Sequence, residues 1–271
     1  MNHTFDYNYL ATYTDELRSQ GRYSFTIEDL HSKFNLSENA IKKSLQRLRN
    51  KKAIAIIRKG FYVVIPPEFR SKEMLPPLHF VAALMKYVKR DYYVSLLSAA
   101  SLYGAAHQQS QTFFVMTKKP VLLPIQSKRI KIIFCYKKHW ENEDIVDRKI
   151  EVGYVKVSSA ALTALDLISY YDKCGGFNSV ATILQELAEE LDGVELANVA
   201  QRYAQVATVQ RLGYLLEINL GRKDLTLGLE KYLKTVKTYP ILLRPDKQKP
   251  SSMKVGNCWK VVPNIEIETD L

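Results

Sequence analysis

The sequence has few cysteines and no long apolar run, and both absences limit what the protein can be. Cys135, Cys174 and Cys258 are odd in number and far apart, so they predict neither a disulfide framework nor a zinc site and favour a reducing compartment. No apolar stretch approaches the roughly 20 residues that a membrane span needs. The segment Met1–Asp6 lacks the basic start and apolar run of a secretion signal. We therefore expect a cytoplasmic protein without a membrane partner.

Acidic residues are absent from one stretch, Asn39 to Pro67. Within it lie the cations Lys42, Lys43, Arg47, Arg49, Lys51, Lys52, Arg58 and Lys59. The whole chain carries a net charge of +11: residues 1–70 hold 12 Lys and Arg against 7 Asp and Glu, and residues 71–271 hold 27 against 21. Cations without compensating acids attract the phosphate backbone of nucleic acid. Both parts of the chain are basic, so both could contact an acidic partner.

The pattern around this stretch predicts a helix-turn-helix. Thr26 is a good N-cap, and the acids that follow it suit the start of a helix. Apolar residues at helical spacing over 27–34 predict one buried stripe, and Ser37 can cap a second helix. In that helix, Ile41, Leu45 and Leu48 fall on one face, which we expect to be buried. An opening helix with Phe5, Tyr9, Tyr13 and Leu17 at a spacing of four is expected to pack on this pair.

The opposite face of the second helix is rich in amides and cations, which are the groups that hydrogen-bond base edges and phosphates in a major groove. After the helix, residues 53–57 and 61–65 predict a hairpin whose turn, Arg58-Lys59-Gly60, forms the tip of a wing. The predicted DNA-binding residues are Asn39, Lys42, Lys43, Gln46, Arg47, Arg49, Asn50, Arg58 and Lys59. A solvated helix face or a protein-docking winged helix is the alternative, and charge alone does not exclude RNA, although an amide-rich helix suits B-DNA better.

Two Pro-Pro pairs bracket the segment Pro66–Pro77, which we interpret as a linker with local structure. It divides the chain into a winged helix-turn-helix domain, residues 1–70, and a larger α+β domain, residues 71–271. In the second domain, helices are predicted at 78–89, 94–104, 158–171, 177–191, 194–213 and 227–236, and strands at 112–117, 130–134, 151–157 and 258–262. The expected fold class is α+β: an N-terminal winged helix-turn-helix followed by a mixed α/β domain with a small sheet and a helical C-terminal half.

Two segments of the second domain carry a family resemblance. Residues 92–109, Tyr-Tyr-Val-Ser-Leu-Leu-Ser-Ala-Ala-Ser-Leu-Tyr-Gly-Ala-Ala-His-Gln-Gln, resemble a signature of the AbiEi abortive-infection antitoxins, and Gln210–Glu217 resembles a second marker. The wing, Lys59–Tyr62, and the segment Pro66–Arg70 have the matching order and spacing. The resemblance covers roughly residues 5 to 262.

The resemblance implies the antitoxin of a type IV toxin–antitoxin system. Such an antitoxin represses its own promoter through the N-terminal domain and neutralises a nucleotidyltransferase-like toxin through the C-terminal domain, without a stable complex being required. Because one winged helix reads few base pairs, we expect cooperative binding or self-association on an inverted repeat of double-stranded DNA in the chain's own promoter. The alternative is a stand-alone transcription regulator whose C-terminal domain senses a ligand.

Residues that could carry chemistry are scattered. Cys135 and His139 lack a third metal ligand, and we expect an ordinary strand end there. The acids Glu143, Asp144, Asp147 and Glu151 before Lys156 could suggest a nuclease, but we interpret them as a solvated loop leading into a strand. His107, Gln108 and Gln109 are a polar cluster that suggests either a capped loop or a role in antitoxicity. We therefore predict no catalytic residue, no metal and no cofactor. A basic stretch from Lys234 to Lys260 suggests either a nucleic-acid surface or a solvated face.

Overall fold

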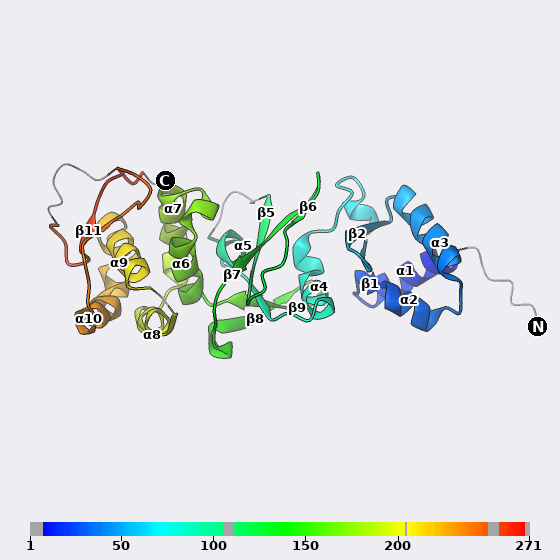
Figure 1. Ribbon diagram of the computed structural model, residues 1–271, viewed down its shortest axis with the longest axis horizontal. Coiled ribbons are helices and arrows are strands. Elements are labelled where there is room, and N and C mark those ends of the chain that lie inside the picture. Colours follow the sequence, from blue (N-terminus) through cyan, green and yellow to red (C-terminus); the bar gives the residue numbers. More distant parts are fainter. Residues whose placement is uncertain (1–7, 106–110, 204, 249–254, 269–271) are drawn as a thin grey trace, which may run out of the picture.

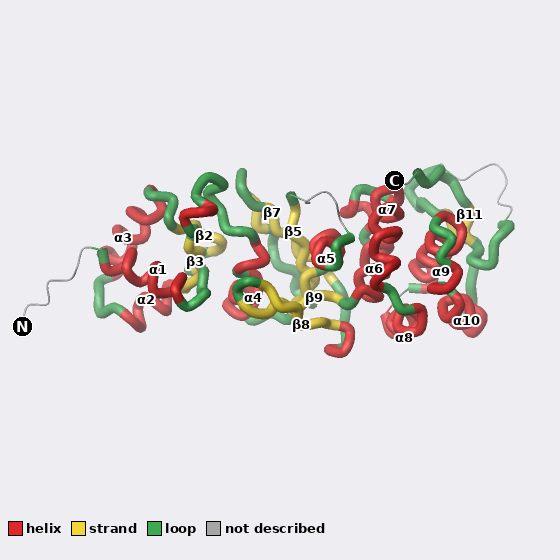
Figure 2. The backbone as a smooth tube through the Cα atoms, turned by 180° about the vertical axis from the view of Figure 1, so that it is seen from behind, coloured by secondary structure: helices red, strands yellow, loops and turns green. Residues whose placement is uncertain are grey.

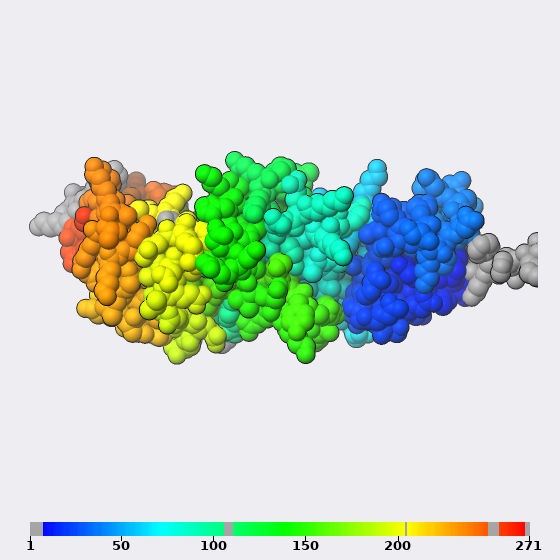
Figure 3. Space-filling view, turned by 90° about the horizontal axis from the view of Figure 1, so that it is seen from below, coloured from blue at the N-terminus to red at the C-terminus, as the bar shows by residue number. Residues whose placement is uncertain are grey.

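The computed structural model describes residues 8–105, 111–203, 205–248 and 255–268. The molecule is elongated, and its parts follow one another along the long axis in sequence order (Figure 1, Figure 3). The N-terminal elements lie at one end, a mixed sheet lies in the middle, and a group of helices lies at the other end (Figure 2). The cluster His107–Gln109 lies outside the described residues. No helix among the described residues is long and apolar enough to cross a membrane.

The N-terminal part has the element order expected of a winged helix-turn-helix. Its elements are α1 (Tyr9–Ser19), β1 (Ser24–Thr26), α2 (Ile27–Lys33), α3 (Glu38–Asn50), β2 (Ile54–Arg58) and β3 (Phe61–Val64). The strands form an antiparallel sheet in the order β1-β3-β2. Thr26 begins α2 with a capping box: its hydroxyl accepts from the Asp29 N–H at 3.1 Å, and its own N–H donates to Asp29 Oδ2 at 2.7 Å.

The core of this part is built from the stripes that the sequence predicts. It contains Leu10, Tyr13, Leu17, Phe25, Leu30, Ile41, Leu45, Leu48, Ile54 and Val64, which are all buried. Ile41, Leu45 and Leu48 point from α3 into this core and thereby turn the opposite face of α3 to solvent.

The middle part is a mixed six-stranded sheet. It consists of α4 (Val81–Tyr87), β4 (Tyr92–Val94), α5 (Leu96–Leu102), β5 (Thr112–Thr117), β6 (Ile125–Gln126), β7 (Lys131–Tyr136), β8 (Ile145–Ile150) and β9 (Gly153–Ser158). The strand order is β6-β7-β5-β4-β9-β8, with β5–β7 and β4–β9 parallel and the other pairs antiparallel. The sequence predicts β5, β7 and β9. It does not predict β4, β6 or β8, and the acidic segment that we expected to be a loop contains β8.

The C-terminal half is helical, as expected. Its elements are α6 (Ala160–Ser169), α7 (Phe177–Leu187), α8 (Gly193–Tyr203), α9 (Val206–Tyr214), a π-helical turn (Leu215–Asn219) and α10 (Leu227–Thr235), followed by the parallel pair β10 (Ile241–Leu242) and β11 (Val261–Val262). Short 3-10 turns lie at Pro67–Phe69, Pro77–His79, Asn142–Asp144, Tyr171–Cys174, Ala188–Glu190 and Lys223–Leu225. The single helix predicted over 194–213 is two helices, because Gln205 has an extended backbone and caps α9.

The linker Pro66–Pro77 is part of a shared core. Leu75 is fully buried, and it belongs to the same apolar cluster as Phe61 of the wing and Leu84 of α4. The carboxylate of Glu73 forms ion pairs with Lys52, at the end of the N-terminal helix pair, and with Arg129, in the β6–β7 turn. The expected linker with local structure is therefore packed against both parts. The division of the chain at residue 70 stays a prediction.

Candidate nucleic-acid interface

The α3 helix is placed by its cap and by its buried face. The Ser37 hydroxyl accepts from the Ala40 N–H at 3.3 Å, which stabilises the first turn. Ser44 is buried beside the apolar residues of α3, and the Arg47 guanidinium donates to its hydroxyl at 2.7 Å. These contacts fix which side of α3 faces solvent.

The solvent face of α3 brings together most of the predicted DNA-binding residues. Asn39, Lys42, Lys43, Gln46, Arg47, Arg49 and Asn50 are all exposed. Gln46 Nε2 donates to Asn50 Oδ1 at 2.9 Å, and Arg49 donates to Gln46 Oε1 at 3.4 Å, so the amides lie next to one another. Glu38, just before the acid-free stretch, pairs with Lys42 at 3.1 Å, and this contact lowers the pKa of Glu38. The face can offer amides for base edges beside cations for phosphates.

The wing turn contacts the middle part. Arg58 is half-buried: its guanidinium donates to the Leu123 carbonyl at 2.8 Å and lies 5.7 Å from the Phe134 ring. The Lys59 carbonyl accepts from the Tyr87 hydroxyl at 3.1 Å. Gly60 has φ +79°, and a Cβ there would lie 2.6 Å from the same hydroxyl, so the turn needs glycine both for its backbone and for this close approach. Of the two predicted wing cations, only the Lys59 side chain is exposed.

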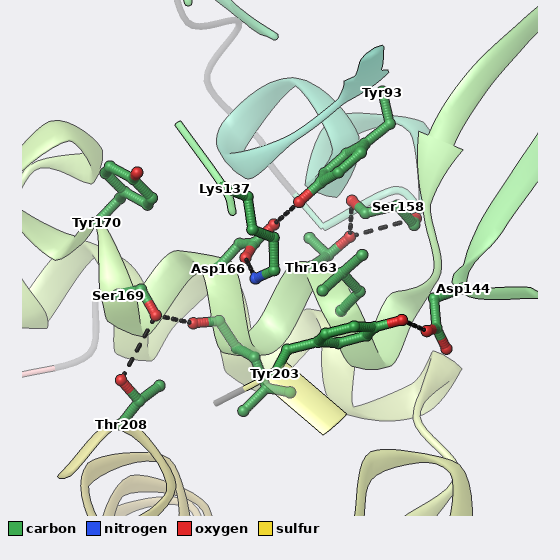
Figure 4. Close-up of polar contacts among 12 residues, drawn as sticks. Tyr93, Lys137, Asp144, Ser158, Thr163, Asp166, Ser169, Tyr170, Tyr203 and Thr208 are labelled. Carbon is green, nitrogen blue, oxygen red and sulfur yellow. Dashed lines mark hydrogen bonds and ion pairs between the residues drawn. The ribbon is translucent and has the colours of Figure 1, made fainter. Parts of the chain in front are cut away.

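Inside the middle part, a buried polar network joins the sheet to the C-terminal helices (Figure 4). The fully buried Asp166 of α6 accepts from the Tyr93 hydroxyl at 2.8 Å and pairs with Lys137 Nζ at 2.6 Å. Burial, together with the charge of Asp166, raises the pKa of Tyr93 well above its usual value. The carboxyl group, phenol and ammonium satisfy one another, as buried polar groups must. Tyr93 is the middle residue of β4, and Lys137 directly follows β7.

A second buried carboxylate belongs to Asp144, one of the acids considered for a nuclease. Asp144 is held by Arg202 and by the Tyr203 hydroxyl, both from the end of α8. Burial and this contact raise the pKa of Tyr203 to about 12. Asp147 instead pairs with Lys156 across the β8–β9 ladder at 3.6 Å, and Glu151 lies 3.2 Å from His79. The acids therefore have separate partners, and the described residues contain no group of three His, Cys, Asp or Glu side chains that could hold a metal ion.

The segment Gln210–Glu217 attaches the end of the chain to α9. Gln210 is buried and donates to the carbonyls of Tyr239 (2.9 Å) and Trp259 (2.7 Å). The Arg211 guanidinium donates to the Leu242 and Leu243 carbonyls, and burial lowers its pKa. Glu217 accepts from the Trp259 indole at 3.0 Å. This marker therefore holds β10 and β11 in place. The sequence alone does not predict this role, because each partner lies about 30 to 50 residues further along the chain.

Comparison with known proteins identifies the domain. Residues 93–218 match the family model described as the AbiEi antitoxin C-terminal domain. The predicted resemblance is confirmed: the chain carries an AbiEi antitoxin domain that contains the sheet, the buried network and the Gln210–Glu217 marker. This supports an antitoxin role in a toxin–antitoxin system, with a toxin as the functional partner.

The fold is shared with a solved structure. The crystal structure of the RV2827C protein from Mycobacterium tuberculosis matches with a TM-score of 0.67 and 13% sequence identity, covering 96% of this chain and 92% of that one. The alignment includes the N-terminal elements as well as the matched domain, so the whole arrangement recurs despite low identity. No curated protein matches the sequence at a significant level.

Proposed function

We propose that the chain is the antitoxin of a type IV toxin–antitoxin system and that it also represses its own promoter. In this proposal, α3 enters the major groove of an operator with inverted repeats, and the C-terminal domain neutralises a nucleotidyltransferase-like toxin. The observation that carries the DNA-binding half is the exposed face of α3, where amides and cations gather opposite the buried face formed by Ile41, Ser44, Leu45 and Leu48. The antitoxin half is supported by the matched domain.

Among the predicted contacts, the α3 residues Asn39, Lys42, Lys43, Gln46, Arg47, Arg49 and Asn50 are proposed to meet the DNA first. Lys59 remains a proposed phosphate contact because its side chain is exposed. Arg58 would have to give up its hydrogen bond to Leu123 before it could reach a phosphate. We therefore assign it the smallest share of the proposed interface.

The proposal is tested with full-length variants in two assays. Lys42→Ala combined with Lys43→Ala removes two exposed cations, so promoter affinity should fall and its salt dependence should flatten by about 1–2 units of slope. Gln46→Ala should cost roughly 1–3 kcal/mol at the cognate operator and little on unrelated duplexes. Both variants should still restore growth when the proposed nucleotidyltransferase-like toxin is expressed.

The matched control is Lys173→Ala combined with Lys231→Ala, which removes the same charge from exposed positions in the C-terminal half. The control should retain promoter binding and rescue. Unchanged DNA binding in the α3 variants would refute the groove assignment. Loss of rescue in folded α3 variants would show that neutralisation requires DNA binding and would contradict the division of labour.

One observation favours a second function, that of a ligand-sensing regulator. A recess of about 540 Å³ lies between the N-terminal part and α4, with Tyr23, Phe61, His79 and Tyr87 in its walls. An occupant would contact both parts and so could change the placement of α3. Failure of the wild-type chain to rescue growth, together with intact promoter binding, would favour this function over the antitoxin role.

A further inference from the structure

A second basic site lies on the middle part, away from the α3 face. It is a recess of about 480 Å³ whose walls include Lys86, Arg90, Lys118 and Lys156 together with the side chain of Trp140. Its volume falls within the range of small-molecule sites, roughly 300–1,000 Å³. The two acids in the wall, Asp91 and Glu141, leave an excess of positive charge.

The fold brings these cations together from segments that are far apart in the sequence. Lys86 and Arg90 lie on and just after α4, which packs on β9 (Figure 1). Lys118 follows Thr117, which pairs with Tyr92 at the start of β4. Lys156 precedes Val157, which pairs with Val94 on the other side of β4. The four cations therefore surround the beginning of one central strand.

Two of these cations are not neutralised within the described part of the chain. No ion pair joins Lys86 or Arg90 to a described acid. Lys86 is exposed and Arg90 is half-exposed, so both can reach a ligand in the recess. Lys118 pairs with Asp91 at 3.4 Å and Lys156 with Asp147 at 3.6 Å, through side chains that are about half exposed or more. Such exposed pairs are worth only about 0–1 kcal/mol each. An incoming anion can therefore replace the carboxylates at little cost.

One wall of the recess is rigid. Trp140 is buried, its ring meets the Tyr93 ring edge-on at 5.0 Å, and Tyr93 is held in turn by Asp166. Lys118 Nζ lies 4.8 Å from the centroid of the Trp140 ring. A wall fixed by the buried network, with exposed or half-exposed cations before it, is suited to a compact anion with several oxygens.

From this arrangement we propose that the recess binds phosphate groups, either those of a free nucleoside triphosphate or those at the end of a nucleic-acid strand. Lys86 and Arg90 provide the uncompensated charge, and Lys118 and Lys156 exchange their carboxylate partners for phosphate oxygens. The site is separate from α3, so binding of phosphate there would not depend on the proposed DNA-binding face.

Isothermal titration of the full-length protein tests the site. Inorganic triphosphate and a nucleoside triphosphate form one arm, and a short single-stranded RNA with and without a 5′ phosphate forms the other. The variant Lys86→Gln with Arg90→Gln should weaken binding at least about tenfold, because two charge-assisted contacts are lost. The control Lys173→Gln with Lys231→Gln changes the net charge equally and should bind like the wild type.

The fluorescence of Trp140 reports whether the ligand enters this recess. The chain has two tryptophans, and Trp259 is fully buried, so an emission change on adding the triphosphate should come from Trp140 as Lys118 moves. Binding of triphosphate alone identifies a free nucleotide as the source, and tighter binding of the phosphorylated RNA identifies a strand end.

Several outcomes would overturn the proposal. These are no binding in either arm, binding with no change in emission, or an equal loss in the control variant. Promoter binding by Lys86→Gln with Arg90→Gln should stay within about twofold of wild type. A matching loss of promoter binding would assign these cations to the operator surface and contradict a separate site, whereas failure of the α3 variants alone would leave this site untouched.

Discussion

At the scale of single residues, the tightest constraint is the contact between Gly213 and Trp259. A Cβ built on Gly213 would lie 2.1 Å from the Trp259 ring. Only glycine at this position therefore allows α9 and the end of the chain to pack so closely. The sequence shows that Gly213 stands in a recognisable marker, but not what it touches. The apolar face of a helix predicts burial, whereas the identity of a partner 46 positions away depends on the folded chain.

Gly213→Ala is therefore expected to destabilise the protein by about 1–3 kcal/mol, because the ring must move or the strand pair β10–β11 must shift. Chemical denaturation followed by circular dichroism measures the change. Gly256→Ala is the matched control, since nothing lies within 4 Å of a Cβ there. Equal stability of the two variants would show that the Trp259 ring can move away from position 213 without a loss of stability.

The exposed position of the α3 residues follows from the sequence, whereas their contact with DNA stays a prediction. A cap, an apolar stripe and a run of cations are local features, and each follows from helical spacing alone. Arg58 was different: its charge suggested a phosphate contact, but its partner is a carbonyl 65 positions away. Charge indicates what a side chain prefers, while tertiary packing decides which partner it meets.

At the scale of elements, helices were predicted better than strands. The strand β4 is only three residues long and runs directly into α5, so its pattern is indistinguishable from the start of a helix. The edge strand β8 contains Asp147, Arg148 and Lys149, and this run of charged residues gives no apolar alternation to recognise. Strands that are stabilised mainly by pairing with neighbouring strands are the hardest to predict from the sequence.

The burial of Tyr92 in the central strand β4 predicts that the stability of the protein depends on pH. Burial raises the pKa of Tyr92 to about 12. Below pH 10 the phenol is protonated in both the folded and the unfolded chain and has no effect. Between pH 10 and 12 the unfolded chain loses this proton while the folded chain keeps it, so the free energy of unfolding should fall as the pH rises.

Tyr92→Phe should make that decline shallower by up to about 1 kcal/mol per pH unit. Urea denaturation at several pH values between 9 and 12 measures the slopes. Tyr154→Phe, at a position 65% exposed, is the control and should keep the wild-type slope. A slope that Tyr92→Phe leaves unchanged would mean that β4 opens before the phenol ionises.

At the scale of the whole molecule, the N-terminal and middle parts share one apolar cluster. Ile57, Phe61 and Val63 of the wing pack with Leu75, Phe80 and Leu84. The sequence predicts a linker from its prolines, but proline content indicates only that a helix is disfavoured there. It does not show that Leu75 is fully buried.

Leu75→Ala should therefore destabilise both parts together and lower the free energy of unfolding by about 2–5 kcal/mol. Hydrogen exchange should become faster in β2, β3 and α4 by similar amounts. Leu30→Ala is the comparison, because Leu30 is equally buried but belongs to the core of the N-terminal part alone. Faster exchange confined to the linker in Leu75→Ala would show that the two parts are energetically independent.

The contact between the wing turn and Tyr87 bears on how two copies of the protein would be oriented on an operator. If α3 binds an operator as proposed, this contact and the shared apolar cluster would carry its orientation on the duplex over to the rest of the elongated molecule. Two chains on sites one helical turn apart, about 10 base pairs, would then point their far ends in related directions. Adding half a turn of DNA would place those ends on opposite sides of the duplex. The spacing between half-sites would thus determine whether neighbouring chains can contact each other.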